Sequence, residues 1–526
     1  MTEKPLLTDE KWRRLACCAL FTYLWGIGAH LYGLVNGLFS HDSLNALVAT
    51  QSEEIWKLRL GRFLVPVYRA LVRGNLAAPW LIGLIAFGCI ALAVYLMSEL
   101  FRLPSRLGQF LLSGLITTGV TVSALIATYN YELDIDMLSF LLSVLAVWLW
   151  QRHKWGFIGG AAVLTLSLAL YQAYIAVTLT LCMLLCICLA LEGAGSRQLI
   201  RQGAKAVAML LLAGLTYALL LQLVRLVSGI SADGGSYNSL TKLKDVFSPQ
   251  LPGRVLKAWI AGLKRYGRLI PAYSKALQYV LHLSLFGLCG YFMLRGLRAL
   301  RGNLAAKILL VILTALLPLG MNALYVLDGG IMHALMEMPF SCAYALCLYL
   351  LFNERQRGDE KNRSSRGPRL IGTVLLCALL AGNLQTANAL YLKKDLEKRA
   401  TLSYMTRAAD RIEAHPGYER GVTPVAVYGV YELGTVPGFE QYASLVGQHS
   451  GNAVTIPLRR EDFDLYSAYF NEILNLDIAF CRLDKWREIM DSDALRQMPC
   501  FPKEGCVGTI DGVLVVKMGE RYRMED

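Results

Sequence analysis

The sequence predicts an α-helical polytopic membrane protein with about eleven transmembrane helices and a small C-terminal α/β domain. The composition, the apolar blocks and the distribution of Lys and Arg all point to this class. Of the 526 residues, 55% are hydrophobic and only 17% are charged, whereas a soluble domain has about 45–50% apolar and about 25% charged residues. The mean hydropathy is +0.43. This composition argues against a purely water-soluble enzyme.

A helix needs about 20 predominantly apolar residues to cross the hydrocarbon layer of a membrane. Eleven segments approach this length: residues 15–37, 79–101, 106–128, 136–150, 156–170, 173–191, 204–227, 276–294, 304–326, 338–352 and 369–391. The stretch from Trp155 to Leu191 has one polar break, at Tyr171-Gln172-Ala173-Tyr174. The stretch is long enough for two spans, so we interpret it as two short spans that meet at this break. The alternative, a single long tilted helix, would leave ten spans and invert the orientation of all later segments.

Lys and Arg accumulate in alternate loops, which predicts the orientation of the chain. The inner segments run from Lys4 to Arg14, Arg102 to Arg106, Arg152 to Lys154, Arg197 to Lys205, Arg295 to Lys307 and Arg355 to Arg369. Opposite them, the loops 129–135, 171–174 and 326–337 contain no Lys or Arg. The N-terminus is therefore expected in the cytoplasm and the C-terminus outside it. This orientation explains the formal net charge of +13 without a nucleic acid as a partner.

The chain divides into a membrane body, residues 1–391, and an extracytoplasmic α/β domain, residues 392–526. The spacing of apolar residues predicts an amphipathic helix over Leu396 to His415, and Val425 to Val430 reads as a short buried strand. Two β-rich runs within Val507 to Met518 flank Asp511-Gly512, a dipeptide typical of tight hairpins. No motif in this domain indicates a particular reaction or ligand.

The first candidate site is the segment Phe39-Ser40-His41-Asp42-Ser43, directly after the first span. Asp42 at the outer membrane surface could act as a general base on an acceptor hydroxyl, while His41 tunes its pKa or contacts the substrate. The alternative is a helix N-cap, in which Ser40 or Asp42 accepts hydrogen bonds from free backbone amides.

Basic residues follow in the same loop. The segment from Ile55 to Val72 alternates apolar and basic residues, as an interfacial amphipathic helix would. Arg62 or Arg59 could clamp a lipid phosphate, for which a planar guanidinium is well suited. Simple snorkelling toward lipid headgroups is the alternative. Arg225, embedded among leucines near the outer end of the seventh span, is a further candidate.

Two more groups of polar residues lie on the same outer face. The loop after the third span carries Glu132, Asp134 and Asp136 without a Lys or Arg, so these carboxylates must be hydrated, hydrogen-bonded, bound to a cation or facing another loop. Tyr171, Gln172 and Tyr174 occupy the break between spans five and six. They are placed to hydrogen-bond a sugar, although interfacial tyrosines are also common membrane anchors.

The order of these motifs resembles a known family. Phe39-Ser40-His41-Asp42-Ser43-Leu44, then Gly61-Arg62-Phe63, then Pro79-Trp80 at the start of the second span, resembles the bacterial GtrII-like glucosyltransferases. The segment from Ser167 to Tyr174, with its Tyr-Gln pair, is similar to a segment of that family. The resemblance covers roughly residues 10–390 and is strongest before residue 180.

This family belongs to the multi-span GT-C glycosyltransferases, so the resemblance implies a GT-C-like fold and a hexosyltransferase. A sugar, typically glucose, would be carried on a polyprenyl phosphate and transferred at the outer leaflet of the bacterial plasma membrane. The acceptor would be a cell-surface polysaccharide such as O-antigen. The implied partners are the polyprenyl-phosphate-linked sugar, the polysaccharide acceptor and membrane lipids, with no nucleic acid.

The resemblance also implies roles for the candidate residues. Asp42, beside His41, would deprotonate the acceptor hydroxyl, and the lipid phosphate would depart from the anomeric carbon. Arg62 would hold the phosphate, with Arg59, Arg225 and the basic loop 242–268 as alternatives. Glu132, Asp134 and Asp136 would bind acceptor hydroxyls or a divalent cation such as Mg or Mn, and Tyr171, Gln172 and Tyr174 the sugar. No other cofactor is implied.

Two other classes of function remain open at this stage. A polysaccharide or lipid-linked oligosaccharide transporter should have charged groups or broken helices near the midplane, and the sequence has few. A non-catalytic assembly subunit would depend mainly on residues 392–526. The concentration of acidic, aromatic and basic residues in the outer loops favours chemistry at the outer leaflet.

Overall fold

The computed structural model describes residues 9–38, 40, 43, 51–75, 77–230, 249–299, 304–327, 332–352, 366–429 and 463–520. The chain divides into two compact units. The first comprises Met1–Tyr32, Ala49–Ile126 and Glu132–Asn388, and the second comprises Gly33–Val48, Ala127–Tyr131 and Ala389–Asp526. The C-terminal region thus groups with two short segments from the first half of the chain.

The first unit consists mainly of apolar helices, the last of which continues into the second unit. Within the described ranges, nine helices are long and apolar enough to cross a membrane, and two shorter ones are also apolar. Their elements are α1 (Asp9–Val35), α5 (Pro79–Leu100), α6 (Arg106–Thr117), α7 (Val120–Thr128), α8 (Leu133–Arg152), α9 (Gly156–Leu170), α10 (Ile175–Leu191), α11 (Ser196–Ser228), α14 (Lys275–Ala299), α15 (Leu304–Met321), α17 (Met338–Cys342), α18 (Tyr344–Phe352) and α19 (Arg366–Glu413). Each of the eleven predicted spans falls on these helices, which confirms a polytopic helical membrane protein.

The polar break in the long apolar stretch separates two helices, as predicted. Helix α9 ends at Leu170, and Tyr171 is extended, with φ −155° and ψ 117°. A single 3-10 turn follows, η2 (Gln172–Tyr174), before α10 begins at Ile175. An extended residue cannot continue the helical hydrogen-bond ladder, so the chain changes direction here and presents the turn at the ends of two helices.

The prediction of one interfacial helix over Ile55 to Val72 is wrong. The segment forms two short helices, α3 (Gln51–Arg59) and α4 (Leu64–Val72). Gly61 lies between them at φ +80°, a left-handed conformation that ends a helix and favours glycine. A Cβ atom at this position would lie 2.4 Å from the Tyr217 hydroxyl. Glycine is therefore needed both for the turn and for its close contact with α11.

The acidic cluster also differs from the prediction of a loop before a span at residue 136. Helix α8 begins at Leu133, so Asp134 and Asp136 lie in its first turn, and Glu132 is its N-cap residue. Acidic residues are favourable there because the backbone amides of a helix N-terminus carry partial positive charge. All three carboxylates are buried, with exposed fractions of 4% or less.

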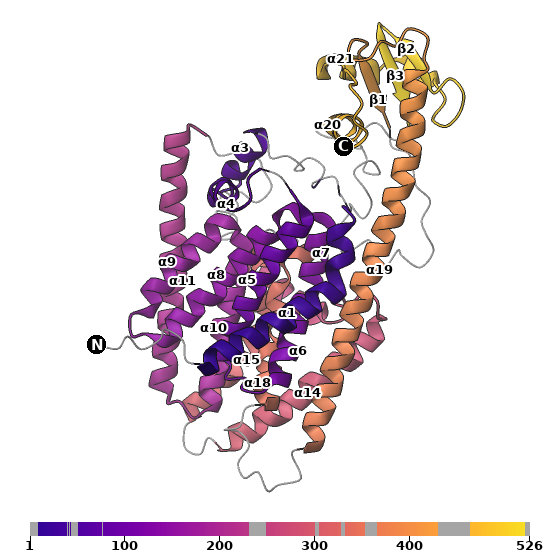
Figure 1. Ribbon diagram of the computed structural model, residues 1–526. Helices are drawn as coiled ribbons and strands as arrows, with labels where there is room; N and C mark the ends of the chain where they lie inside the picture. The colour runs from indigo at the N-terminus through magenta and orange to yellow at the C-terminus, as the bar shows by residue number, and fades with distance from the viewer. Residues whose placement is uncertain are drawn as a thin grey trace. The chain divides into compact units, whose positions relative to one another are not determined.

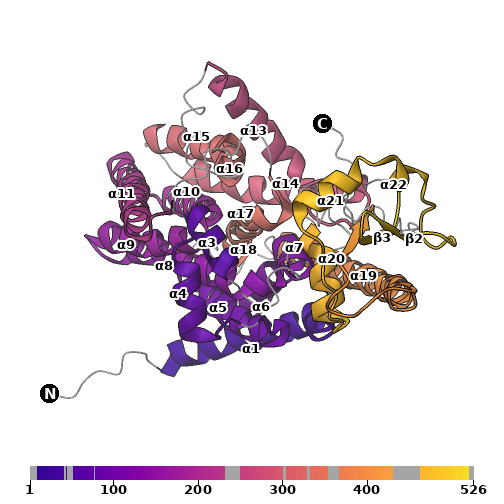
Figure 2. The same ribbon diagram turned by 90° about the horizontal axis from the view of Figure 1, so that it is seen from above.

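The helices of the first unit hold these segments together. Helix α8 packs against α5 and α9, α9 packs against α11 and α4, and α10 packs against α15. Figures 1 and 2 show α3 and α4 across one end of this group of helices, close to α8 and α9. Two further helices, α13 (Leu251–Arg265) and α16 (Ala323–Leu327), and the 3-10 turn η4 (Ala334–Met336) also belong to this unit.

The second unit contains a small three-stranded sheet. Its strands are β1 (Val425–Tyr428), β2 (Val507–Ile510) and β3 (Val513–Lys517), in the order β1-β3-β2. Strand β1 is parallel to β3, and β2 is antiparallel to β3. Asp511 and Gly512 join β2 to β3 with φ 47° and φ 78°, as a tight hairpin requires. The predicted strand and hairpin are confirmed.

Side chains on the two faces of this sheet enter different apolar clusters, because successive residues of a strand point to opposite sides. Val425 and Val427 pack with Ile412 near the end of α19, whereas Ala426 and Tyr428 pack with Trp486. The predicted helix over Leu396 to His415 is the C-terminal part of α19. Shorter helices complete the sheet region: α20 (Phe463–Ala468), a π-helical turn η8 (Tyr469–Ile473), α21 (Leu483–Met490) and α22 (Asp493–Gln497).

The second unit also includes the residues on either side of the first candidate site. Ser40 donates a hydrogen bond from its hydroxyl to the Thr128 carbonyl at 2.5 Å, and its amide donates to the Ser43 hydroxyl at 2.6 Å. Both serines are buried. His41 and Asp42 themselves lie outside the described residues.

Candidate functional site

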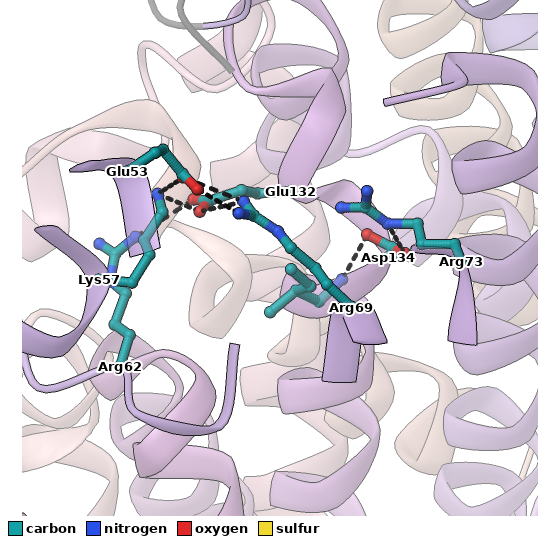
Figure 3. A network of polar contacts seen from close by, with 8 residues as sticks. Glu53, Lys57, Arg62, Arg69, Arg73, Glu132 and Asp134 are labelled. Carbon is teal, nitrogen blue, oxygen red and sulfur yellow. Dashed lines mark hydrogen bonds and ion pairs between the residues drawn. The ribbon is translucent and has the colours of Figure 1, made fainter. Parts of the chain in front are cut away.

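The candidate site in the first unit is built from three segments that are distant in sequence. They are the pair α3 and α4 with the turn between them, the beginning of α8, and the turn η2 between α9 and α10. Lys57, Arg62 and Arg69 come from the first segment, Glu132 from the second and Tyr171 from the third. Figure 3 shows the charged residues of the first two segments pointing toward one another.

Three cationic side chains surround the Glu132 carboxylate. Lys57 contacts its Oε1 atom directly, Arg62 donates to its Oε2 atom at 3.2 Å, and the second guanidinium nitrogen of Arg69 lies 3.6 Å from Oε1. The side chains of Lys57 and Glu132 are each only 5% exposed. A buried carboxylate requires such partners, since an unpaired charge in a low-dielectric interior is costly.

A second carboxylate joins this group. Glu53 pairs with Arg69 through a direct contact, and its Oε1 atom lies 3.3 Å from the Lys57 ammonium, one helical turn away. We call Glu53, Lys57, Arg62, Arg69 and Glu132 the cationic cluster (Figure 3). With three cations and two carboxylates it has a formal charge of +1. Because water is largely excluded, this excess charge acts strongly on an arriving anion.

Asp134 belongs to a separate pair beside the cluster. Arg73 donates to its Oδ2 atom at 2.8 Å, and the Tyr68 hydroxyl donates to the same oxygen at 3.0 Å. The side chain of Asp134 is fully buried. Burial, together with the nearby Asp134 charge, raises the pKa of Tyr68 well above its ordinary value, so this hydroxyl stays protonated and continues to donate. The pair fastens α4 to the start of α8.

The turn at Gly61 is held by residues from the predicted sugar-binding segment. The Gln172 amide donates to the Leu60 carbonyl at 2.9 Å and to the Tyr217 hydroxyl at 2.7 Å, and that hydroxyl donates to the Gly61 carbonyl at 3.1 Å. The Arg62 guanidinium lies 4.3 Å from the centre of the Tyr171 ring. Gln172 therefore positions the turn that carries Arg62, and Tyr171 supports the guanidinium itself.

Of the other predicted phosphate-binding residues, Arg59 and Arg225 lie near the same turn, whereas Arg265 of the basic loop has a different partner. Arg225 of α11 donates to the Arg59 carbonyl at 3.4 Å, which brings both arginines to the end of α3. Within the basic loop 242–268, residues 242–248 lie outside the described ranges. Arg265, at the end of α13, pairs with Glu337, a fully buried carboxylate.

Sequence reasoning located the acids but missed most of their partners. Lys57, Tyr68 and Arg69 lie in the segment from Ile55 to Val72, which was interpreted as an interfacial helix, and Arg73 directly follows it. Their signal was present in the sequence, because a loop with three carboxylates and no basic residue needs cations from elsewhere. A single sequence does not reveal which basic segment meets it.

The cationic cluster does not suit the divalent cation that the acidic residues alone suggested. Glu132 and Asp134 are already surrounded by Lys and Arg side chains, which repel Mg²⁺ or Mn²⁺. Among the residues that the structure describes, no group of three or more His, Cys, Asp or Glu side chains is arranged to hold a metal ion. The arrangement instead suits a monovalent or divalent anion such as a phosphate group.

Comparison with known proteins gives one match. The model of the family described as glucosyl transferase GtrII matches residues 31–352, which is more than half of the chain and includes the whole cationic cluster. No curated protein and no solved structure matches the chain. Family membership supports a glucosyltransferase role for this membrane protein. On the strength of this match, the chain belongs to the GtrII glucosyltransferase family.

Proposed function

We propose that this protein transfers glucose from a polyprenyl phosphate to a cell-surface glycan at the outer leaflet of the bacterial plasma membrane, with Asp42 as the general base. The family match supports the transferred group, and the cationic cluster supports a phosphate-linked donor. The distribution of Lys and Arg supports the outer location, with the N-terminus in the cytoplasm and the C-terminal α/β domain, residues 392–526, outside it. A GT-C-like arrangement of the helices is part of this proposal.

The charge of the donor changes during this reaction. A polyprenyl phosphate that carries a sugar is a phosphodiester with one negative charge, and the polyprenyl phosphate that departs is a monoester with a second charge. Groups that are already in place where charge develops lower the free energy of the transition state. Lys57, Arg62 and Arg69 are in place in this sense, since their side chains are fixed by buried ion pairs.

The proposed step can be written with all its bonds. The acceptor hydroxyl oxygen attacks the anomeric carbon of the donor glucose and forms the new glycosidic bond. The bond from the anomeric carbon to the phosphate oxygen breaks, and its electron pair stays on the phosphate. The hydroxyl proton moves to the Asp42 carboxylate, with His41 beside it. Phosphate is a good leaving group, so the base and the cationic cluster supply the main requirements.

The observation that carries the proposal is the position of Arg62. Its guanidinium donates to Glu132, stacks on Tyr171 and is presented by a turn that Gln172 and Tyr217 hold. The side chain keeps 15% exposure, whereas those of Lys57 and Arg69 are 5% and 2% exposed. Arg62 is therefore the member of the cluster that a ligand reaches most readily.

Replacing Arg62 with Met tests this proposal. In a transfer assay with purified protein in nanodiscs, polyprenyl-phosphate glucose and a glycan acceptor, we expect Arg62→Met to lower kcat by about 100-fold or more, as for loss of one preorganised transition-state donor. Arg62→Lys should recover only part of the activity, because an ammonium lacks the planar fork.

The matched control is Arg102→Met. Arg102 also pairs with a carboxylate, Glu192, at 2.8 Å, but its side chain is 51% exposed and lies outside the cationic cluster. The control should keep wild-type kcat. Wild-type activity in Arg62→Met, in protein shown to be folded by its thermal transition, would contradict the phosphate-binding role.

A further inference from the structure

One buried carboxylate near the cationic cluster has no partner among the residues that the structure describes. Asp136 follows Glu132 by one helical turn on α8 and is 4% exposed. Glu132 and Asp134 form ion pairs, but in the part of the chain that the structure describes Asp136 forms neither an ion pair nor a hydrogen bond. It lies within electrostatic range of Lys57 and Arg62. Buried polar groups are normally paired, so this exception needs an explanation.

A buried hydroxyl next to Asp136 is in the same situation. Tyr174 is 2% exposed, and its hydroxyl has no hydrogen-bond partner among the described residues. Its ring packs on Phe140, one helical turn after Asp136, with 6.2 Å between ring centres. Tyr174 and Asp136 are close enough to interact electrostatically. One hydrogen-bond acceptor and one donor, both without partners among the described residues, therefore lie in the same part of the helix group.

Three buried serine hydroxyls of α8 and α9 near this pair are hydrogen-bonded. The Ser139 hydroxyl donates to the Ser167 carbonyl at 3.0 Å, and the Ser143 hydroxyl donates to the Tyr174 carbonyl at 3.2 Å. Ser167 donates in turn to the Ser139 carbonyl at 2.8 Å. The hydroxyls of Ser139, Ser143 and Ser167, which flank the pair on α8 and α9, are thus hydrogen-bonded, and the lack of partners at Asp136 and Tyr174 points to a ligand.

The pair lies directly beside the proposed phosphate site. The rings of Tyr174 and Tyr171 meet edge to face with 5.8 Å between their centres, and Arg62 lies over the Tyr171 ring. A group attached to a phosphate at Arg62 is thus within reach of both side chains.

The chemistry of the pair selects a sugar. A carboxylate accepts hydrogen bonds and repels phosphate, and a phenol hydroxyl can donate to a sugar oxygen or accept from a sugar hydroxyl. The aromatic rings supply flat apolar surface for the C–H face of a pyranose. We propose that Asp136 and Tyr174 form the subsite that recognises the hydroxyl groups of the donor sugar. This inference rests on the function proposed above.

The test compares Asp136→Asn and Tyr174→Phe with the wild type on polyprenyl-phosphate glucose and on a series of donors in which the glucose lacks one hydroxyl group. A site built to hydrogen-bond a hydroxyl discriminates strongly against an analogue that lacks it. We expect the wild type to lose at least 100-fold in kcat/KM for one or two of the deoxy donors. In Asp136→Asn we expect kcat/KM for the glucose donor to fall by a similar factor. The ratio of kcat/KM for the glucose donor to kcat/KM for that deoxy donor should then fall toward 1.

Stability gives an independent readout. Within the described ranges neither side chain has a hydrogen bond or an ion pair to lose, so both variants should unfold at a temperature equal to or above that of the wild type. A purely structural role for these residues predicts the opposite, a lower unfolding temperature. Inhibition by polyprenyl phosphate, which has no sugar, should remain unchanged in both variants.

Ser143→Ala is the matched control. Ser143 lies on α8, as Asp136 does, but its buried hydroxyl has a hydrogen-bond partner. This variant should keep the wild-type discrimination between donors. Wild-type kcat/KM and discrimination in both Asp136→Asn and Tyr174→Phe would overturn the subsite while leaving glucosyl transfer intact. Absence of transfer by the wild type itself would overturn the proposed function and the subsite together.

Discussion

Replacing Asp42 with Asn should lower the rate of glucosyl transfer by about 10²–10⁴-fold, the usual contribution of a positioned general base. The amide keeps the size of the side chain but cannot take the proton of the acceptor hydroxyl. The measurement is kcat in the nanodisc assay at saturating donor and acceptor. Because the phosphate would be held by the cationic cluster, inhibition by polyprenyl phosphate should be unchanged.

Glu54→Gln is the control for this experiment. Glu54 belongs to the same outer loop by sequence and lies on α3, but we place it in no step of the reaction. It should keep wild-type kcat. If Asp42→Asn also keeps wild-type kcat, Asp42 is not the base. The base would then be sought in the 132–136 cluster, where Asp136 alone, within the ranges described, is not engaged by a cation.

The second large effect is expected at the pair that fastens α4 to α8. Arg73→Met should destabilise the protein by about 3–5 kcal/mol, because it leaves the fully buried Asp134 carboxylate without its cation. The remaining donors are the Tyr68 hydroxyl and the Ile135 amide. The unfolding free energy in detergent, measured by denaturant titration, reports this loss.

The double variant Arg73→Met/Asp134→Leu distinguishes the cost of leaving one buried charge unpaired from the effect of removing the whole ion pair. Replacing both partners with apolar side chains removes the buried charge along with its partner, so most of the lost stability should return. If the loss of unfolding free energy in the double variant equals the sum of the losses in the two single variants, the ion-pair account is contradicted. Arg152→Met, which removes a 43%-exposed arginine from its pair with Glu99, should change stability by less than about 1 kcal/mol.

The helices of the membrane region were predictable from the sequence because each one depends on a local property. A run of apolar residues long enough to cross a membrane has few other stable structures. The break at Tyr171 and the hairpin at Asp511-Gly512 were also predictable because each depends on a few neighbouring residues. The turn at Gly61 was not predicted because a single glycine in an amphipathic pattern is compatible with a helix. Its left-handed conformation is fixed by contacts with Gln172 and Tyr217.

The site was predictable only in part. Glu132 stood out because a carboxylate at the membrane edge needs a partner, and Arg62 because its motif resembles that of the family. The contacts of Lys57 and Arg69 with Glu132 were missed because Glu132 is distant in sequence, so no short-range spacing connects it to them. The lack of a partner at Asp136 can be recognised only when the surrounding side chains are in place.

The fate of the two bonds at the donor phosphate tests the central claim most directly. A polyprenyl-phosphate glucose labelled with ¹⁴C in the sugar and ³²P in the phosphate is incubated with purified protein in nanodiscs and a glycan acceptor. The proposed reaction predicts that ¹⁴C enters the glycan, while ³²P stays with the polyprenyl chain. In proteoliposomes, movement of both labels together across the bilayer, without ¹⁴C in the glycan, would contradict glucosyl transfer and identify a transporter.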